Sequence, residues 1–139
     1  MLLGEYRHSI DAKNRMFLPS KFRDELGESV FLMKNLDRCI SIFSQSSWSV
    51  YMSKLEALPT VESRDIRRRL LSSVVETPID SQGRILIPQN LREYADLEKN
   101  VRVIGVGESA EIWNEEAFDR KINEIDTDEL TAKLIELGF

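Results

Sequence analysis

The sequence predicts an α+β fold in which two copies of a small β-rich unit are intertwined and flanked by helices. Two observations predict it. A stretch of the chain is repeated, and each copy has the pattern of strand, tight turn, strand, short helix and hairpin. The chain has 139 residues, 42% hydrophobic and 31% charged, as in an ordinary globular domain. Two small β-rich halves, each followed by helices, favour a swapped pair over two independent domains.

The repeat lies at residues 10–24 and 79–93, which read IDAKNRMFLPSKFRD and IDSQGRILIPQNLRE. At an offset of 69, five pairs are identical: Ile10/Ile79, Asp11/Asp80, Arg15/Arg84, Pro19/Pro88 and Arg23/Arg92. After one inserted residue the similarity continues as far as Trp48 and Phe118. We therefore expect a tandem duplication, with a first copy over residues 1–47 and a second over 74–117. A helical connector at 48–73 and acidic C-terminal helices at 118–139 complete the predicted organisation.

Each predicted element follows from local residue chemistry. A strand ends at Ile-Asp, and a polar turn follows in which Asn14 and Gly83 hold a position that tolerates positive φ. The next strand ends at a proline that opens a short helix, over residues 20–26 and 89–95. Alternating apolar residues predict hairpins from strands 30–34 and 40–44, and from strands 101–106 and 110–114. Helical spacing predicts a connector helix through Trp48 and another over residues 62–72, and two more helices from Phe118 onward.

The composition excludes most enzyme chemistry. Cys39 and His8 are the only cysteine and the only histidine, so an intrachain disulfide and a structural zinc site are not expected. No phosphate-binding loop or paired-carboxylate signature is present, and we predict no catalytic residue, metal or cofactor. No apolar run approaches the roughly 20 residues that span a bilayer, and no signal peptide is visible. We therefore expect a cytoplasmic protein without membrane contact.

The net charge of −5 is unevenly placed along the chain. Residues 108–139 carry ten acidic and three basic residues, a net charge of −7, whereas residues 1–107 sum to +2. An acidic total does not exclude a nucleic-acid partner if the positive charge is concentrated on one surface. The acidic helices are either a solvated face or a site for a basic partner.

The doubled motif Asp-x-x-x-Arg straddles the turn of each copy. One interpretation is structural: the aspartate closes the turn through its backbone and pairs with the arginine. Another is that the turn presents Arg15 and its neighbours outward as a basic tip, because arginine suits bidentate contact with guanine or phosphate. The two interpretations are compatible.

The start MLLGEY, the paired turns DAKNRMFLP and DSQGRILIP, and the segments LREYADL and VIGVGESAEIW resemble the MraZ family. The resemblance covers residues 1–120 and implies an AbrB-like swapped-hairpin fold, in which both repeats form one pseudo-symmetric double-psi β-barrel. It also implies a regulator of the bacterial division and cell-wall gene cluster. Such a regulator binds repeated G-rich promoter boxes as a closed ring, usually of eight subunits. By motif position, Asp11 and Arg15 match the first signature, and Asp80 and Arg84 match the second.

The two turns differ in charge. The first presents Lys13, Asn14 and Arg15 together, whereas Gln82 and Gly83 leave Arg84 alone. We predict that the first hairpin dominates contact with double-stranded DNA, and that Arg84 is structural or touches a neighbouring subunit. The predicted DNA-binding residues are Lys13, Asn14, Arg15, Lys21 and Arg23, and the motif residues with structural roles are Asp11, Asp80 and Arg84.

The expected partners are double-stranded DNA and further copies of the chain, with no small-molecule substrate and a nucleoid location. The alternative function is a protein-interaction module of the antitoxin kind, which would bind a partner through the acidic C-terminal helices.

Overall fold

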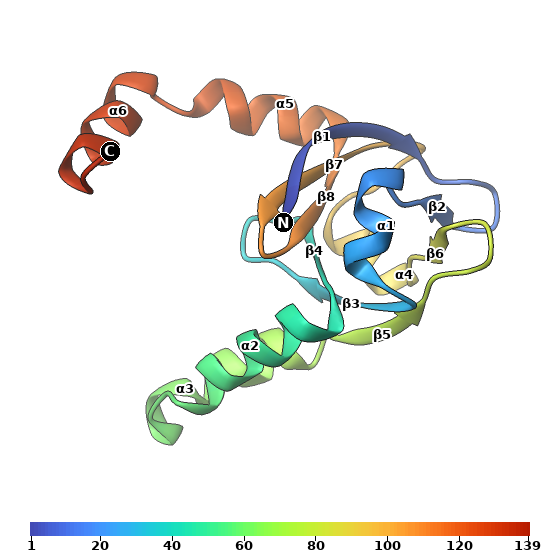
Figure 1. Ribbon diagram of the computed structural model, residues 1–139, viewed down its shortest axis with the longest axis horizontal. Helices are drawn as coiled ribbons and strands as arrows, with labels where there is room; N and C mark the ends of the chain where they lie inside the picture. The colour runs from blue at the N-terminus through green and yellow to red at the C-terminus, as the bar shows by residue number, and fades with distance from the viewer.

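The computed structural model describes residues 1–139 and confirms the α+β class (Figure 1). In chain order the elements are β1 (Leu2–Ser9), β2 (Arg15–Phe17), α1 (Ser20–Leu26), β3 (Ser29–Lys34), β4 (Ile40–Phe43), α2 (Gln45–Glu56), α3 (Thr60–Leu71), β5 (Val75–Pro78), β6 (Arg84–Leu86), α4 (Gln89–Tyr94), β7 (Asn100–Gly107), β8 (Ala110–Asn114), α5 (Glu115–Glu124) and α6 (Thr127–Glu136). None of the helices has the length and apolarity needed to cross a membrane.

The strands of the two copies interleave instead of forming separate sheets. The main sheet is antiparallel and has the order β1-β7-β8-β4-β3-β5. The first strand of each copy therefore pairs with the third strand of the other copy: β1 with β7, and β5 with β3. The remaining strands, β2 and β6, pair with each other as a two-stranded ribbon. Exchanging the copies, so that β1 replaces β5 and β4 replaces β8, reproduces the same order read backwards. This arrangement confirms the predicted swapped-hairpin fold with pseudo-twofold symmetry.

One hydrophobic core lies between the main sheet, the ribbon and the two short helices. Met16 and Ile85 enter it from the ribbon, Phe22 from α1 and Leu91 from α4, all at most 2% exposed. Burial of such side chains contributes about 1.5–3 kcal/mol each. Because each copy supplies part of every layer, the two copies fold as one unit.

The helices that follow each copy occupy equivalent places. The Ser44 side chain caps α2 by accepting a hydrogen bond from the Ser47 N–H. The Asn114 side chain caps α5 in the same way by accepting one from the Ala117 N–H. The connector therefore becomes helical at Gln45, before Trp48, because the serine cap starts the first turn early. The next helix likewise begins at Thr60 and not at residue 62, directly after Pro59.

The two helical pairs differ in how they pack. Leu70 of α3 packs against Met33 and Phe43, so α2–α3 covers the sheet. Phe118 of α5 packs in the same way against Trp113 and Cys39, but α6 projects away from the body (Figure 1). The buried Cys39 thiol has a raised pKa, first because of desolvation and then because of Glu111 and Asp37.

Candidate nucleic-acid interface

Both Asp-x-x-x-Arg turns are closed by their aspartate. Asp11 Oδ1 accepts the N–H groups of Lys13 and Arg15, each at 2.9 Å, and its Oδ2 accepts Arg15 Nε at 3.0 Å. Asp80 repeats the pattern in the second turn, with Arg84 Nε at 2.8 Å. In both copies the aspartate thus bonds to two backbone N–H groups of its turn and pairs with the arginine. The same bonds fix the plane of each guanidinium group, which also suits the second interpretation.

These contacts lower the pKa of both aspartates. The largest cause at Asp11 is the backbone N–H of Arg15, with further contributions from the Arg15 side chain and the Lys13 N–H. At Asp80 the Arg84 N–H acts in the same way. Both carboxylates consequently stay ionised to a lower pH than an unpaired aspartate does.

The outer face of the β2–β6 ribbon carries two arginines and two apolar side chains. In the antiparallel register Arg15 lies opposite Leu86 and Phe17 lies opposite Arg84, while Met16 and its partner point into the core. Phe17 is 45% exposed and Leu86 is 53% exposed. Cross-copy hydrogen bonds hold this ribbon next to the turns, from Leu18 N–H to the Gly83 carbonyl and from Ile87 N–H to the Asn14 carbonyl, both 3.0 Å.

The two arginines are held differently. The Arg84 guanidinium lies 5.8 Å from the centroid of the Phe17 ring, and its side chain is 18% exposed. Arg15 has no aromatic contact and is 31% exposed. In both side chains only the Nε atom has a hydrogen-bond partner in the protein, so the terminal nitrogens of Arg15 and of Arg84 are available to an outside acceptor, and the two arginines differ in exposure and in the Phe17 contact.

The other predicted DNA-binding residues differ in exposure and in position. Lys13 and Lys21 are exposed and take part in no ion pair. Asn14 is half-buried with φ 64°, and its carbonyl is used in the cross-copy bond. Arg23 is also half-buried, because its Nη2 donates to the Leu18 carbonyl at 3.2 Å.

Arg23 also explains why a glycine occupies the second turn. Gly83 has φ +83°, and a Cβ atom there would lie 2.3 Å from Arg23 Cζ. Any side chain at this position would therefore displace the guanidinium group. Arg92 occupies the equivalent place in the second copy and donates to the Ile87 carbonyl.

His8 lies on β1 opposite Val101 and is half-buried. Its pKa is lowered from 6.5, first by desolvation and then by the charge of Arg23. The unfolded chain therefore binds this proton at a higher pH than the folded chain does. We expect the free energy of unfolding to decline as the pH falls below 6.5 towards the lower folded-state pKa, and His8→Gln to remove that part of the decline. Urea unfolding at about pH 5.5 and 7.5 checks this, and an unchanged pH dependence in His8→Gln would contradict it.

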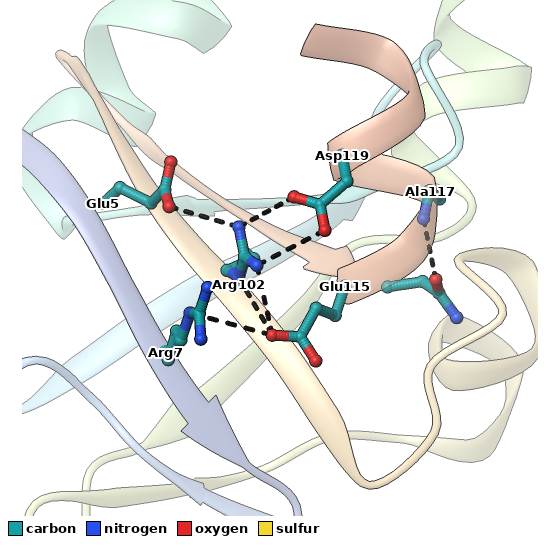
Figure 2. Close-up of polar contacts among 7 residues, drawn as sticks. Glu5, Arg7, Arg102, Glu115, Ala117 and Asp119 are labelled. Carbon is teal, nitrogen blue, oxygen red and sulfur yellow. Dashed lines mark hydrogen bonds and ion pairs between the residues drawn. The ribbon is translucent and has the colours of Figure 1, made fainter. Parts of the chain in front are cut away.

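The sequence analysis missed a charge cluster beneath α5 (Figure 2). Arg102 of β7 has a side chain only 5% exposed, and it meets Glu5 and Glu115 at 3.2 Å and Asp119 at 3.0 Å. Burial opposes its charge, but the Glu115 hydrogen bond and the three carboxylates raise the pKa of Arg102. The cluster ties β1 and β7 to α5. The spacing of the two α5 carboxylates, one helical turn apart, was the available sequence signal.

No group of three or more histidine, cysteine, aspartate or glutamate side chains is arranged to hold a metal ion.

Known proteins are similar to this chain along its length. The family model of the MraZ protein, also described as antitoxin-like, matches residues 1–69 and again residues 70–136. The second match extends beyond Phe118 and so covers α5 and α6 as well. The first match likewise covers α2 and most of α3.

Relatives named transcriptional regulator MraZ occur in several bacteria. The protein of Caldicellulosiruptor saccharolyticus is 47% identical over 144 residues and that of Clostridium tetani 43% over 142, each alignment covering all of both chains. The protein of Acetivibrio thermocellus is 48% identical over 122 residues, covering 86% of this chain and 85% of the relative. With two repeats that match the family model and relatives similar along its whole length, this chain belongs to the MraZ family.

Proposed function

We propose that this protein is a sequence-specific DNA-binding transcriptional regulator whose first Asp-x-x-x-Arg turn contacts the bases. The observation that carries the proposal is that Arg15 is the more exposed of the two turn arginines, while Asp11 fixes its guanidinium plane and both of its terminal nitrogens lack partners. A fixed arginine fork matches the O6 and N7 acceptors of guanine in the major groove. Relatives named as transcriptional regulators support the same function.

The ribbon has the shape for such contact. The major groove admits a two-stranded β-ribbon, and β2–β6 presents its outer face with no other element over it (Figure 1). Phe17 and Leu86 on that face supply apolar surface that suits thymine methyl groups. The ribbon therefore presents polar and apolar side chains that suit base contacts within one short stretch.

The first turn dominates in this proposal. Lys13 and Lys21 contact phosphates, while the less exposed Arg84 positions the ribbon through Phe17 and Asp80. Asn14 shapes the first turn, and Arg23 adds positive charge beside Gly83 of the second turn while donating to the Leu18 carbonyl. No catalytic step and no cofactor are part of this function.

The proposed target is the set of repeated G-rich boxes upstream of the division and cell-wall genes, as the family resemblance implies. One turn makes few contacts, so a closed ring of subunits, eight in the family, would bind repeated boxes by multivalency. We place the protein in the cytoplasm, associated with the nucleoid.

The test is a fluorescence-anisotropy titration of a duplex with tandem G-rich boxes against a scrambled duplex. We expect binding to the box duplex to be tighter and to weaken steeply with salt, by about 0.9 log unit per log unit of salt for each neutralised phosphate. Lys13→Gln should reduce this slope by about one phosphate contact and weaken both duplexes equally. Lys133→Gln on α6 is the matched control and should leave the slope unchanged. A salt-independent affinity would refute the electrostatic part of the proposal.

One observation favours the alternative, a protein-interaction module: every residue from 119 to 139 is exposed, including several apolar ones. Failure of the wild-type protein to bind either duplex at low salt would favour this alternative. Deletion of residues 126–139 would then abolish partner binding.

A further inference from the structure

The α5–α6 segment, here called the C-terminal arm (residues 115–139), is an open version of the α2–α3 hairpin. In the hairpin, α3 folds back and buries Leu70 on the sheet at 7% exposure. In the arm, α6 has no buried residue. Leu130, Leu134 and Leu137 are spaced as one helix face and are 49, 42 and 62% exposed. An amphipathic helix in water is stabilised mainly by packing its apolar face, so this face needs a partner.

The arm also carries unpaired negative charge. Residues 115–139 hold eight acidic and three basic residues, a net charge of −5. Of the carboxylates between residues 124 and 136, only Glu136 meets a cation, Lys133 at 3.6 Å. A groove of about 580 Å³ opens at the elbow of the arm, between Ile125, Leu130 and Glu129. The partner should therefore offer positive charge together with apolar surface.

A surface of that chemistry lies elsewhere on the same chain. Three cations surround the ring of Tyr94: Lys34 Nζ and Arg38 Cζ at 5.1 Å and Arg69 Cζ at 5.9 Å from its centroid. None of the three takes part in an ion pair within the chain. Ile66, 44% exposed, lies one helical turn before Arg69. We call these five residues the basic face.

We propose that the apolar, acidic side of α6 docks on the basic face of a second copy of this chain. Each surface has what the other lacks, because unpaired carboxylates meet unpaired cations and exposed leucines meet Ile66 and Tyr94. The contact is heterologous, since arm and basic face are different surfaces, and such contacts form rings when their rotation closes. The proposal deepens the ring assembly proposed above and rests on it.

Two features of the fold suit this contact. The Arg102 cluster fixes α5 to β1 and β7 of the main sheet, so the arm leaves the body in a set direction (Figure 2). In Figure 1 the arm projects on the side away from the β2–β6 ribbon. The contact made by the arm therefore lies away from the ribbon of its own subunit.

The test uses the full-length protein and measures its mass by light scattering without DNA. An arm variant, Leu130→Asp with Leu134→Asp, and a face variant, Arg38→Glu with Arg69→Glu, should each fall from the oligomer to the 16.1 kDa of one chain. Their matched controls are Thr131→Asp on α6 and Arg68→Glu on α3, which alter neighbouring positions that point elsewhere on the same helices. Both controls should keep the wild-type mass. Circular dichroism at equal concentration establishes that all four variants are folded.

Mixing the two defective variants gives the sharpest readout. The face variant keeps a working arm and the arm variant keeps a working basic face, so one contact forms and the mixture should reach about twice 16.1 kDa and no more. A face variant that still assembles alone would overturn the proposal in favour of arm–arm contact. A folded face variant that keeps its mass but loses affinity for DNA would overturn it and assign the basic face to phosphate contact.

A wild-type protein of 16.1 kDa would also overturn the proposal and leave the arm to a different protein. The assembly readout is separate from the DNA titration of the wild type, so failure of one does not imply failure of the other.

Discussion

Arg15→Ala should weaken binding to a duplex with G-rich boxes by about 5- to 150-fold per contacted site, because a bidentate arginine–guanine contact contributes about 1–3 kcal/mol. Binding to a scrambled duplex should change much less, since phosphate contacts by Lys13 and Lys21 remain. The fold should persist, because Asp11 Oδ1 still closes the turn through two backbone N–H groups. Anisotropy titrations of both duplexes measure the effect, and light scattering checks that the variant still assembles.

Arg84→Ala is the matched variant in the second turn. It removes the same type of side chain from the equivalent position, but one that is less exposed and stacked on Phe17. We expect a smaller loss of DNA affinity than with Arg15→Ala, accompanied by a lower melting temperature. Loss of binding in an assembled Arg84→Ala protein, with Arg15→Ala binding normally, would reverse the assignment of the two turns.

Arg102→Met should lower the free energy of unfolding by about 3 kcal/mol, the lower end of the cost of breaking a buried ion pair. The lower end applies because Glu5 and Asp119 are about half exposed and regain water when the arginine is removed. The methionine fills similar space, so the loss reports mainly the charge cluster. Urea unfolding monitored by tryptophan fluorescence gives the number.

Arg7→Met provides the control for that measurement. Arg7 approaches the same carboxylate, Glu115, at 3.8 Å, but its side chain is 75% exposed. An exposed ion pair contributes about 0–1 kcal/mol, so the stability of this variant should be close to that of the wild type. Equal losses in the free energy of unfolding of the two variants would show that burial of Arg102 does not cause the stabilising effect of its cluster.

The position of the arm depends on the same cluster. Because Arg102 joins Glu115 and Asp119 of α5 to β7, its removal should loosen the arm before the barrel unfolds. Hydrogen exchange of α5 should therefore accelerate in Arg102→Met at denaturant concentrations where the exchange of β4 and β8 is unaffected.

The turn chemistry of this protein could be predicted from its sequence because it is local. An aspartate four residues before an arginine, with Asn14 or Gly83 between them, specifies the closed turn with few distant contacts. The repeat could be predicted for a related reason, since both copies must satisfy the same turn, proline and helix start. The difference in charge between the two turns could also be predicted, because Lys13 in the first turn is replaced by Gln82 in the second.

Other features depended on contacts between distant residues. Arg102 alternates with the buried Val101 and Val103, so its strand position alone predicts an exposed side chain. It is buried because α5 covers that face of the sheet. The cation cluster on Tyr94 also joins β3, the β3–β4 turn, α3 and α4, which no sequence spacing relates.

The sequence by itself determined the duplication, the two Asp-x-x-x-Arg turns, the short helices after each proline and the acidic end of the chain. Only the tertiary structure decided which strands pair across the copies, which arginine of the two turns is more exposed, and that α6 stands away from the barrel while α3 packs on it. The physical reason is one of range. Turns and helix starts depend on residues a few positions apart, whereas strand pairing and charge burial depend on which distant surfaces exclude water from each other.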